Sequence, residues 1–267
     1  MHILFIIIVL ALFPLVSIIK IDGLQTVEGF FIGTSQLKRI IILIILLAMI
    51  LIGRMRFRLF DFSSFRFGRE LLPAIVLISI YLLLKIDGKD LSHDFTLVAP
   101  VLGSALLATF IEELAFRFVI PWNLSKLGVS IGRICVISAL LFSLVHFMNL
   151  RSQHYDVFSV INQLVFAFFM GMLLFSLYYL TRSFLFVWLF HFLTNLPGKL
   201  GSLTPVAEEE VAAAVSTTTM EEIISSALYI LLMSPLIIVS IYYLRKIREN
   251  DRVDLESGRV GNNLFDT

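Results

Sequence analysis

Long apolar stretches separated by short polar segments run along most of the chain. Eight of them approach the roughly 20 residues that a helix needs to cross a bilayer, and they lie near 2–19, 37–53, 71–86, 97–120, 131–149, 157–180, 184–198 and 223–244. The pattern predicts an all-α, polytopic membrane protein with about eight transmembrane helices. From Arg245 onward the chain is polar, and we expect this tail to be frayed.

Composition and charge agree with a membrane protein. Hydrophobic residues make up 58% of the 267 residues, charged residues make up 15%, and the mean hydropathy is +0.94. These values lie far from those of a soluble domain. The net charge of +1 leaves no basic face for nucleic acid, so we expect the lipid bilayer and no nucleic acid as a partner.

The distribution of cations predicts the orientation in the membrane. With eight spans both termini share one side, which holds 13 Lys and Arg residues against seven on the other side. Cytoplasmic loops carry an excess of these residues. We therefore expect both termini to be cytoplasmic.

Three charged residues interrupt the fourth apolar stretch: Glu112, Glu113 and Arg117. Ionisable groups within a membrane cost several kcal/mol and usually mark function. On a regular helix Glu113 and Arg117 share a face, whereas Glu112 points about 140° away from Arg117. We predict that Glu113 pairs with Arg117, either as a purely structural ion pair or in support of a site. Glu112 is then free to face another helix.

The next stretch, FSLVH, provides a partner for Glu112. If the fourth and fifth spans form a hairpin that turns near residue 129, between Gly128 and Ser130, then Glu112 lies level with His146. A carboxylate and an imidazole at one depth can hold and deprotonate a water. Phe142 is expected to pack beneath His146.

The stretch HFLTN adds His191 and Asn195, which are four residues apart and so project toward one point. Their hydrogen-bond donors could stabilise the oxyanion that forms when water attacks a carbonyl. No serine or cysteine is suitably placed as a nucleophile, so activated water is the expected attacking group. We expect Asn162 and Gln163 to form hydrogen bonds between helices. The alternative is that they line the cavity.

These motifs occur in the order EELAFR (112–117), FSLVH (142–146) and HFLTN (191–195). In this order they resemble the CAAX prenyl protease type 2 family, also called the Abi or CPBP intramembrane proteases. The resemblance covers residues 97–198, including Gly171. It implies a four-helix catalytic core at 97–198, with unmatched helices at 1–96 and a loop, last helix and tail at 199–267.

The resemblance implies a glutamate-dependent endopeptidase of a bacterial plasma membrane that cleaves a membrane-associated or prenylated peptide or protein. Glu112 and His146 would activate water, His191 and Asn195 would line the oxyanion site, and Glu113 and Arg117 would support them. One alternative is a non-catalytic bacteriocin-immunity or scaffold protein of the same fold. Another is an ion-binding transporter, against which the lack of paired broken helices counts. No particular oligomeric state is indicated.

We predict no cofactor. A zinc site is the weaker alternative and would use Glu112, His146 and His191 as ligands. Against it, the chain has no H-E-x-x-H helix, and Arg117 would repel a divalent cation. His146 lies about 17 residues, or roughly 25 Å, from the predicted turn, which places the site toward the face opposite that turn.

Overall fold

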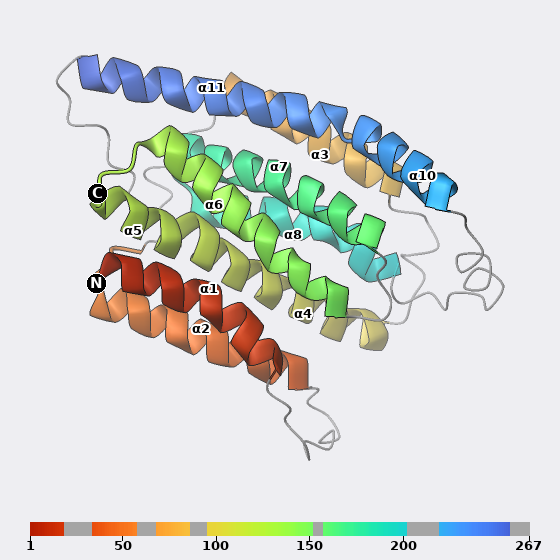
Figure 1. The fold of residues 1–267 in the computed structure, drawn as a ribbon, viewed down its shortest axis with the longest axis horizontal. Helices are drawn as coiled ribbons and strands as arrows, with labels where there is room; N and C mark the ends of the chain where they lie inside the picture. The colour runs from red at the N-terminus through yellow and green to blue at the C-terminus, as the bar shows by residue number, and fades with distance from the viewer. Residues whose placement is uncertain (19–33, 58–67, 86–94, 152–156, 202–218, 257–267) are drawn as a thin grey trace.

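The computed structural model describes residues 1–18, 34–57, 68–85, 95–151, 157–201 and 219–256 (Figure 1). Every regular element within these ranges is helical, which confirms the predicted all-α fold. In chain order the elements are α1 (His2–Ile18), α2 (Thr34–Ile52), η1 (Arg69–Leu71), α3 (Leu72–Lys85), α4 (Phe95–Glu113), η3 (Leu114–Val119), α5 (Ile120–Lys126), α6 (Ile131–Val145), η4 (His146–Arg151), α7 (Val157–Thr181), α8 (Phe184–Gly201), α10 (Thr219–Leu232) and α11 (Ser234–Glu256).

The helices lie side by side along the long axis of the molecule (Figure 1). α4, η3 and α5 form one continuous helix, which builds the central bundle together with α6, α7 and α8. In this bundle α6 packs on α7, and α4 packs on α8. α1 and α2 cover one side through contacts with α5 and α4, while α3 and α11 cover the opposite side through contacts with α8 and α7.

The described helices support a membrane-spanning protein. Val98–Lys126, Ile131–Met148 and Val157–Thr181 are each long and apolar enough to cross a bilayer. α10 and α11 form a fourth membrane-spanning segment if the bent pair is counted as one span. His2–Val16 is a shorter apolar helix. A described helix falls in each of the eight predicted ranges. The protein is an integral membrane protein, and the number of eight spans stays a prediction.

The last predicted span is broken. α10 and α11 meet at Met233 with a bend of 47°. Pro235 is the second residue of α11 and lacks the N–H that a continuous helix would use, which explains the break at this point.

The predicted fraying from Arg245 was wrong for residues 245–256, because α11 continues to Glu256. Tyr243 and Ile247 are fully buried, one turn apart on the face of α11 that meets the bundle. The Tyr243 hydroxyl donates a hydrogen bond to the Glu70 carbonyl in η1, immediately before α3. Arg, Lys and Glu are good helix formers, so a polar sequence anchored by this face remains helical.

The predicted turn near residue 129 is confirmed. α5 ends at Lys126, Gly128 has the positive φ of 76° that favours glycine, and Ser130 immediately precedes α6. The turn reverses the chain, so α6 runs back along α4 and α5 and brings the end of α6 toward the middle of the long helix.

Gly171 lets α7 approach α6 closely beside the predicted site. A Cβ atom on Gly171 would lie 3.0 Å from Ala139 Cα and 3.3 Å from the ring of Phe142. The glycine therefore sets the distance between these helices. At Gly103, on α4, an added Cβ atom would have no such neighbour within 4 Å.

We expect Gly171→Leu to lower the free energy of unfolding by about 1–3 kcal/mol, because the added side chain overpacks the α6–α7 contact. Gly103→Leu is the matched control and should be neutral or slightly stabilising. Thermal unfolding of both variants in detergent measures the difference. Equal melting temperatures would contradict the close contact.

Candidate active site

The acidic pair lies where the long helix changes its winding. α4 ends at Glu113, and Leu114–Val119 form a turn of π-helix before α5 begins. All six π-helical residues are buried. The Phe116 carbonyl within this turn accepts a hydrogen bond from the Ser138 hydroxyl on α6, which satisfies a backbone group inside the bundle. Such π-turns are rare and often occur at functional sites.

The predicted pairing of Glu113 with Arg117 is confirmed. Arg117 Nε lies 3.2 Å from Glu113 Oε2, and both side chains are fully buried. The Arg117 guanidinium carbon lies 4.6 Å from the centre of the Phe142 ring. None of the three guanidinium nitrogens makes a hydrogen bond to the described residues. Charge attraction and the aromatic face therefore hold this cation in the interior.

Glu113 has a second partner that the sequence reasoning missed. Its Oε1 accepts a hydrogen bond from His191 Nδ1 at 2.7 Å, and His191 is almost fully buried. This bond fixes the proton on Nδ1 and leaves Nε2 facing the cavity. The two residues are 78 positions apart, and no local sequence signal links them.

The register of α8 against α4 places His191 opposite the acidic pair. Trp188 Nε1 donates hydrogen bonds to the Leu106 carbonyl at 3.1 Å and to Thr109 Oγ1 at 3.2 Å. Trp188 lies one turn before His191 on α8, so this anchor sets both the depth and the rotation of the histidine.

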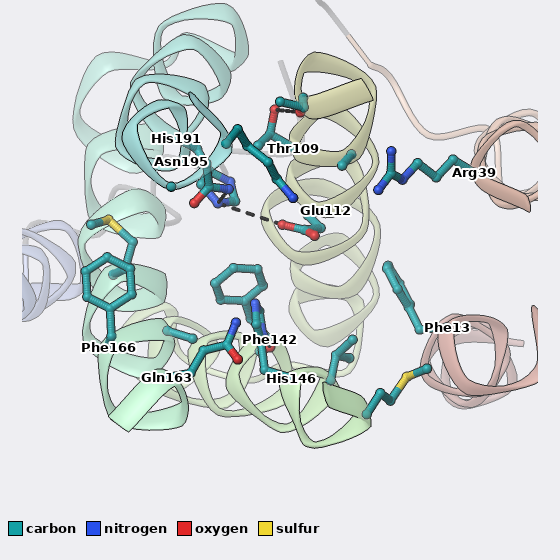
Figure 2. Close-up of a pocket in the computed structure, with 18 residues that line it drawn as sticks. Phe13, Arg39, Thr109, Glu112, Phe142, His146, Gln163, Phe166, His191 and Asn195 are labelled. Carbon is teal, nitrogen blue, oxygen red and sulfur yellow. Dashed lines mark hydrogen bonds and ion pairs between the residues drawn. The ribbon is translucent and has the colours of Figure 1, made fainter. Parts of the chain in front are cut away.

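Glu112 turns away from the core and into the cavity, as predicted. Its side chain is 26% exposed, whereas that of Glu113 is 0% exposed. Glu112 Oε2 lies 3.7 Å from His191 Nε2, and Asn195 Nδ2 lies 3.2 Å from the same ring nitrogen. Figure 2 shows Glu112, His191 and Asn195 meeting from α4 and α8. The predicted convergence of His191 and Asn195 on one point is therefore observed.

His146 lies at the end of α6, where the helix passes into η4. Its Nδ1 donates a hydrogen bond to the Phe142 carbonyl at 3.0 Å, so Nε2 is left as an acceptor. The Phe142 ring makes edge contacts with both His146 and His191, at centroid distances of 5.1 and 5.7 Å. Phe142 is therefore the packing residue that the sequence predicted, and it also supports the second histidine.

Glu112 and His146 form no hydrogen bond or ion pair with each other in the described structure, although both line one cavity. They face a shared space (Figure 2). Their place in one cavity agrees with the predicted common depth, and a water held between them stays a prediction.

The cavity has a volume of about 500 Å³. The four predicted catalytic side chains, Glu112, His146, His191 and Asn195, all line it. Its wall also includes residues of the first two helices, which the sequence reasoning left without a role. The lining residues are Phe13, Arg39, Ala105, Ala108, Thr109, Glu112, Phe142, Val145, His146, Met148, Gln163, Phe166, Ala167, Met170, His191, Asn195, Gly198 and Lys199.

Arg39 is the main addition to the predicted site. It extends from α2 toward α4 (Figure 2) and donates hydrogen bonds to the Ser104 carbonyl, at 3.2 Å, and to the Ser104 hydroxyl. A cation therefore lies in the same cavity as Glu112. In the sequence Arg39 is a basic residue at the edge of a predicted span, a pattern that gives no sign of a cavity.

The two polar residues of α7 have different environments. Asn162 Nδ2 donates to Ser226 Oγ at 3.1 Å and so links α7 to α10, as expected for an interhelical hydrogen bond. Gln163 lines the cavity, which was the less favoured alternative.

Glu112, His146 and His191 are the side chains that would hold a metal ion. Within the described ranges no group of three or more His, Cys, Asp and Glu side chains has an arrangement that fits a metal ion. The geometry gives no support to the zinc alternative, and the reaction without a metal stays a prediction.

Comparison with protein families gives one match. Residues 94–197 match the family described as type II CAAX prenyl endopeptidase Rce1-like. The chain carries a domain of this family. The match contains all three motifs and ends two residues after Asn195, close to the predicted limits of 97 and 198. Comparison with curated proteins gave no match.

The Rce1-like domain spans the long helix, α6, α7 and most of α8. These four helices carry every predicted catalytic residue. Phe13 and Arg39 lie outside the matched segment, so α1 and α2 complete the cavity wall from a part of the chain that the family match does not cover.

We expect Arg117→Met to lower the free energy of unfolding by about 3–5 kcal/mol, because Glu113 would keep a buried charge without its cation. The double variant Glu113→Gln with Arg117→Met should recover most of this loss. Thermal unfolding in detergent measures both, and Arg245→Met, which removes an exposed arginine, is the control. If the single and double variants were equally unstable, the two side chains would not be coupled.

Proposed function

We propose that this protein is an intramembrane endopeptidase that hydrolyses a peptide bond of a membrane-associated or prenylated protein or peptide. The observation that carries the proposal is the convergence of Glu112, His146, His191 and Asn195 on one cavity inside an apolar helical bundle. The Rce1-like domain supports a protease of the CAAX type.

In this mechanism a water lies between Glu112 and His146. His146 Nε2 accepts one of its hydrogens, because Nδ1 already donates to the Phe142 carbonyl. Glu112 removes the other proton as the water oxygen attacks the peptide carbonyl carbon. The low polarity of the surrounding helices strengthens these interactions relative to water.

Asn195 and His191 stabilise the oxyanion of the tetrahedral intermediate. The Asn195 amide, which lies beside His191 Nε2, turns to donate to the new O⁻. A proton taken up at Nε2 from solvent would make His191 a second donor to the same O⁻, because Nδ1 is already engaged with Glu113. When the C–N bond breaks, Glu112 returns its proton to the departing amine. The products are a carboxylic acid, which keeps the second hydrogen of the water, and a free amine.

Glu113 acts in this mechanism as a positioning residue. It holds the Nδ1 proton of His191 and is itself balanced by Arg117. It does not line the cavity and so does not touch the substrate. The arrangement resembles other sites in which a carboxylate orients a histidine through one ring nitrogen.

The location of the cavity bears on the substrate. The end of α6, the start of α7 and the end of α8, which carry the cavity residues His146, Gln163 and Lys199, lie opposite the turn at 127–130, whereas α1 begins and α11 ends on the side of that turn (Figure 1). With both termini cytoplasmic, as the cation distribution favours, the site lies toward the outer face of a bacterial plasma membrane. A cavity of about 500 Å³ accepts a short extended peptide segment. We therefore favour an exported or membrane-embedded peptide.

We expect Glu112→Gln to lower the cleavage rate about 100- to 10,000-fold while leaving insertion and melting temperature unchanged, because the variant removes the base without changing its size. The experiment compares the termini of membrane-associated peptides from cells that carry the intact protein or the variant. A terminus present only with the intact protein identifies the substrate and the cleaved bond.

Glu249→Gln, an exposed acid on α11, is the matched control and should behave like the intact protein. Identical peptide termini in all three strains, with normal expression, would refute the proposal. A phenotype that persists in the Glu112 variant would then favour a non-catalytic immunity or scaffold protein.

Metal dependence is tested with the purified protein and the peptide identified in this way. We expect treatment with a strong zinc chelator, followed by its removal, to leave the cleavage rate unchanged, because water activation here rests on Glu112 and His146. Loss of cleavage that added zinc restores would contradict the metal-independent mechanism.

A further inference from the structure

A second cavity lies at the opposite end of α6 from the candidate active site. It has a volume of about 260 Å³ and lies between the start of α6 and the polar half of α11. Three arginines and one aspartate contribute to it, so its wall carries net positive charge. The lining residues are Ser130, Gly132, Arg133, Arg248, Asp251 and Arg252.

The cavity depends on a close approach between the two helices. A Cβ atom on Gly132 would lie 2.8 Å from Arg248 Cγ and 3.1 Å from Arg248 Nε. Glycine at this position therefore allows the Arg248 side chain to cross the first turn of α6. The fully buried Ile247 fixes α11 beside it.

Two of the three arginines at this cavity have side chains without a protein partner among the described residues. The Arg133 and Arg248 side chains are both exposed, and neither guanidinium makes a hydrogen bond or ion pair to another described residue. Ser130, the residue before α6, makes no side-chain hydrogen bond to the helix that it precedes. Two guanidinium groups thus face the cavity together with the positive end of a 15-residue helix.

The cavity also lies at a defined level of the membrane. Ile131 begins one of the membrane-length helices, and the polar part of α11 begins at Arg245, after its apolar half. Figure 1 shows the start of α6 beneath this part of α11. The boundary between apolar and polar residues on both helices corresponds to the headgroup region of a bilayer, where lipid phosphates lie.

We propose that this cavity binds a phosphate group, carried by an anionic phospholipid or by soluble phosphate. Arginine suits this ligand because its planar guanidinium forms paired hydrogen bonds to phosphate oxygens. The inference does not depend on the proposed peptidase activity, because it concerns different residues at the other end of the bundle.

The test uses the full-length protein in a neutral detergent. Native mass spectrometry measures binding of phosphatidylglycerol, with phosphatidylcholine for comparison, and thermal unfolding with inorganic phosphate measures the soluble ligand. We expect Arg133→Gln and Arg248→Gln each to weaken binding of the preferred ligand about fivefold. The double variant should be weakened by roughly the product of the two effects.

Two further variants separate a built site from a general basic surface. Arg245→Gln removes an exposed arginine from the same helix outside the cavity, and it should bind like the intact protein. Gly132→Ala keeps every charge but displaces Arg248, and it should weaken binding as Arg248→Gln does.

Binding of phosphatidylglycerol that excess inorganic phosphate does not displace would identify a lipid site, whereas stabilisation by phosphate alone would identify a soluble ligand. The proposal would be overturned if neither ligand bound. It would also be overturned if the double variant bound like the intact protein, or if Arg245→Gln weakened binding as much as Arg248→Gln.

Discussion

The carboxylate of Glu113 lies between the Arg117 guanidinium and the His191 ring, in the fully buried centre of the bundle. A lone carboxylate or guanidinium there would be too costly to keep charged, so each needs the other. Together they fix the long helix against α6 through Phe142 and against α8 through His191. The contact with Glu113 also sets the orientation of His191, which faces the cavity. The same side chains therefore stabilise the core and fix the geometry of the site.

Neighbouring residues of an α-helix point about 100° apart, which gives the two adjacent glutamates different environments, and the π-turn begins immediately after them. Glu112 lines the cavity. Glu113 points into the interior, beside the completely buried segment Leu114–Val119. The changed winding is supported from outside the helix by the hydrogen bond from Ser138 to the Phe116 carbonyl. A regular α-helix would satisfy its own backbone here, so the π-turn depends on α6 being in place.

The two ends of α6 have different chemistry. At its end, His146 faces a cavity that also holds an acid and an amide, with Arg39 contributed by a helix outside the Rce1-like domain. At its start, arginines of α6 and α11 surround a smaller basic cavity. A helix of this length spans much of the apolar layer. The two cavities therefore lie toward opposite faces of the membrane, and a phosphate site at one face would leave the other free for a peptide.

Sequence alone determined the membrane class, the helical pairs Glu113 with Arg117 and His191 with Asn195, and the turn near Gly128. These follow from the length of apolar runs and from the fixed rise and rotation of an α-helix, both of which are local. Only the tertiary structure decided that Glu113 binds His191, that Arg39 joins the cavity wall, and that α11 stays helical beyond Arg245. Each of these depends on how far one helix is rotated and shifted against another, and the packing of distant side chains sets that relation.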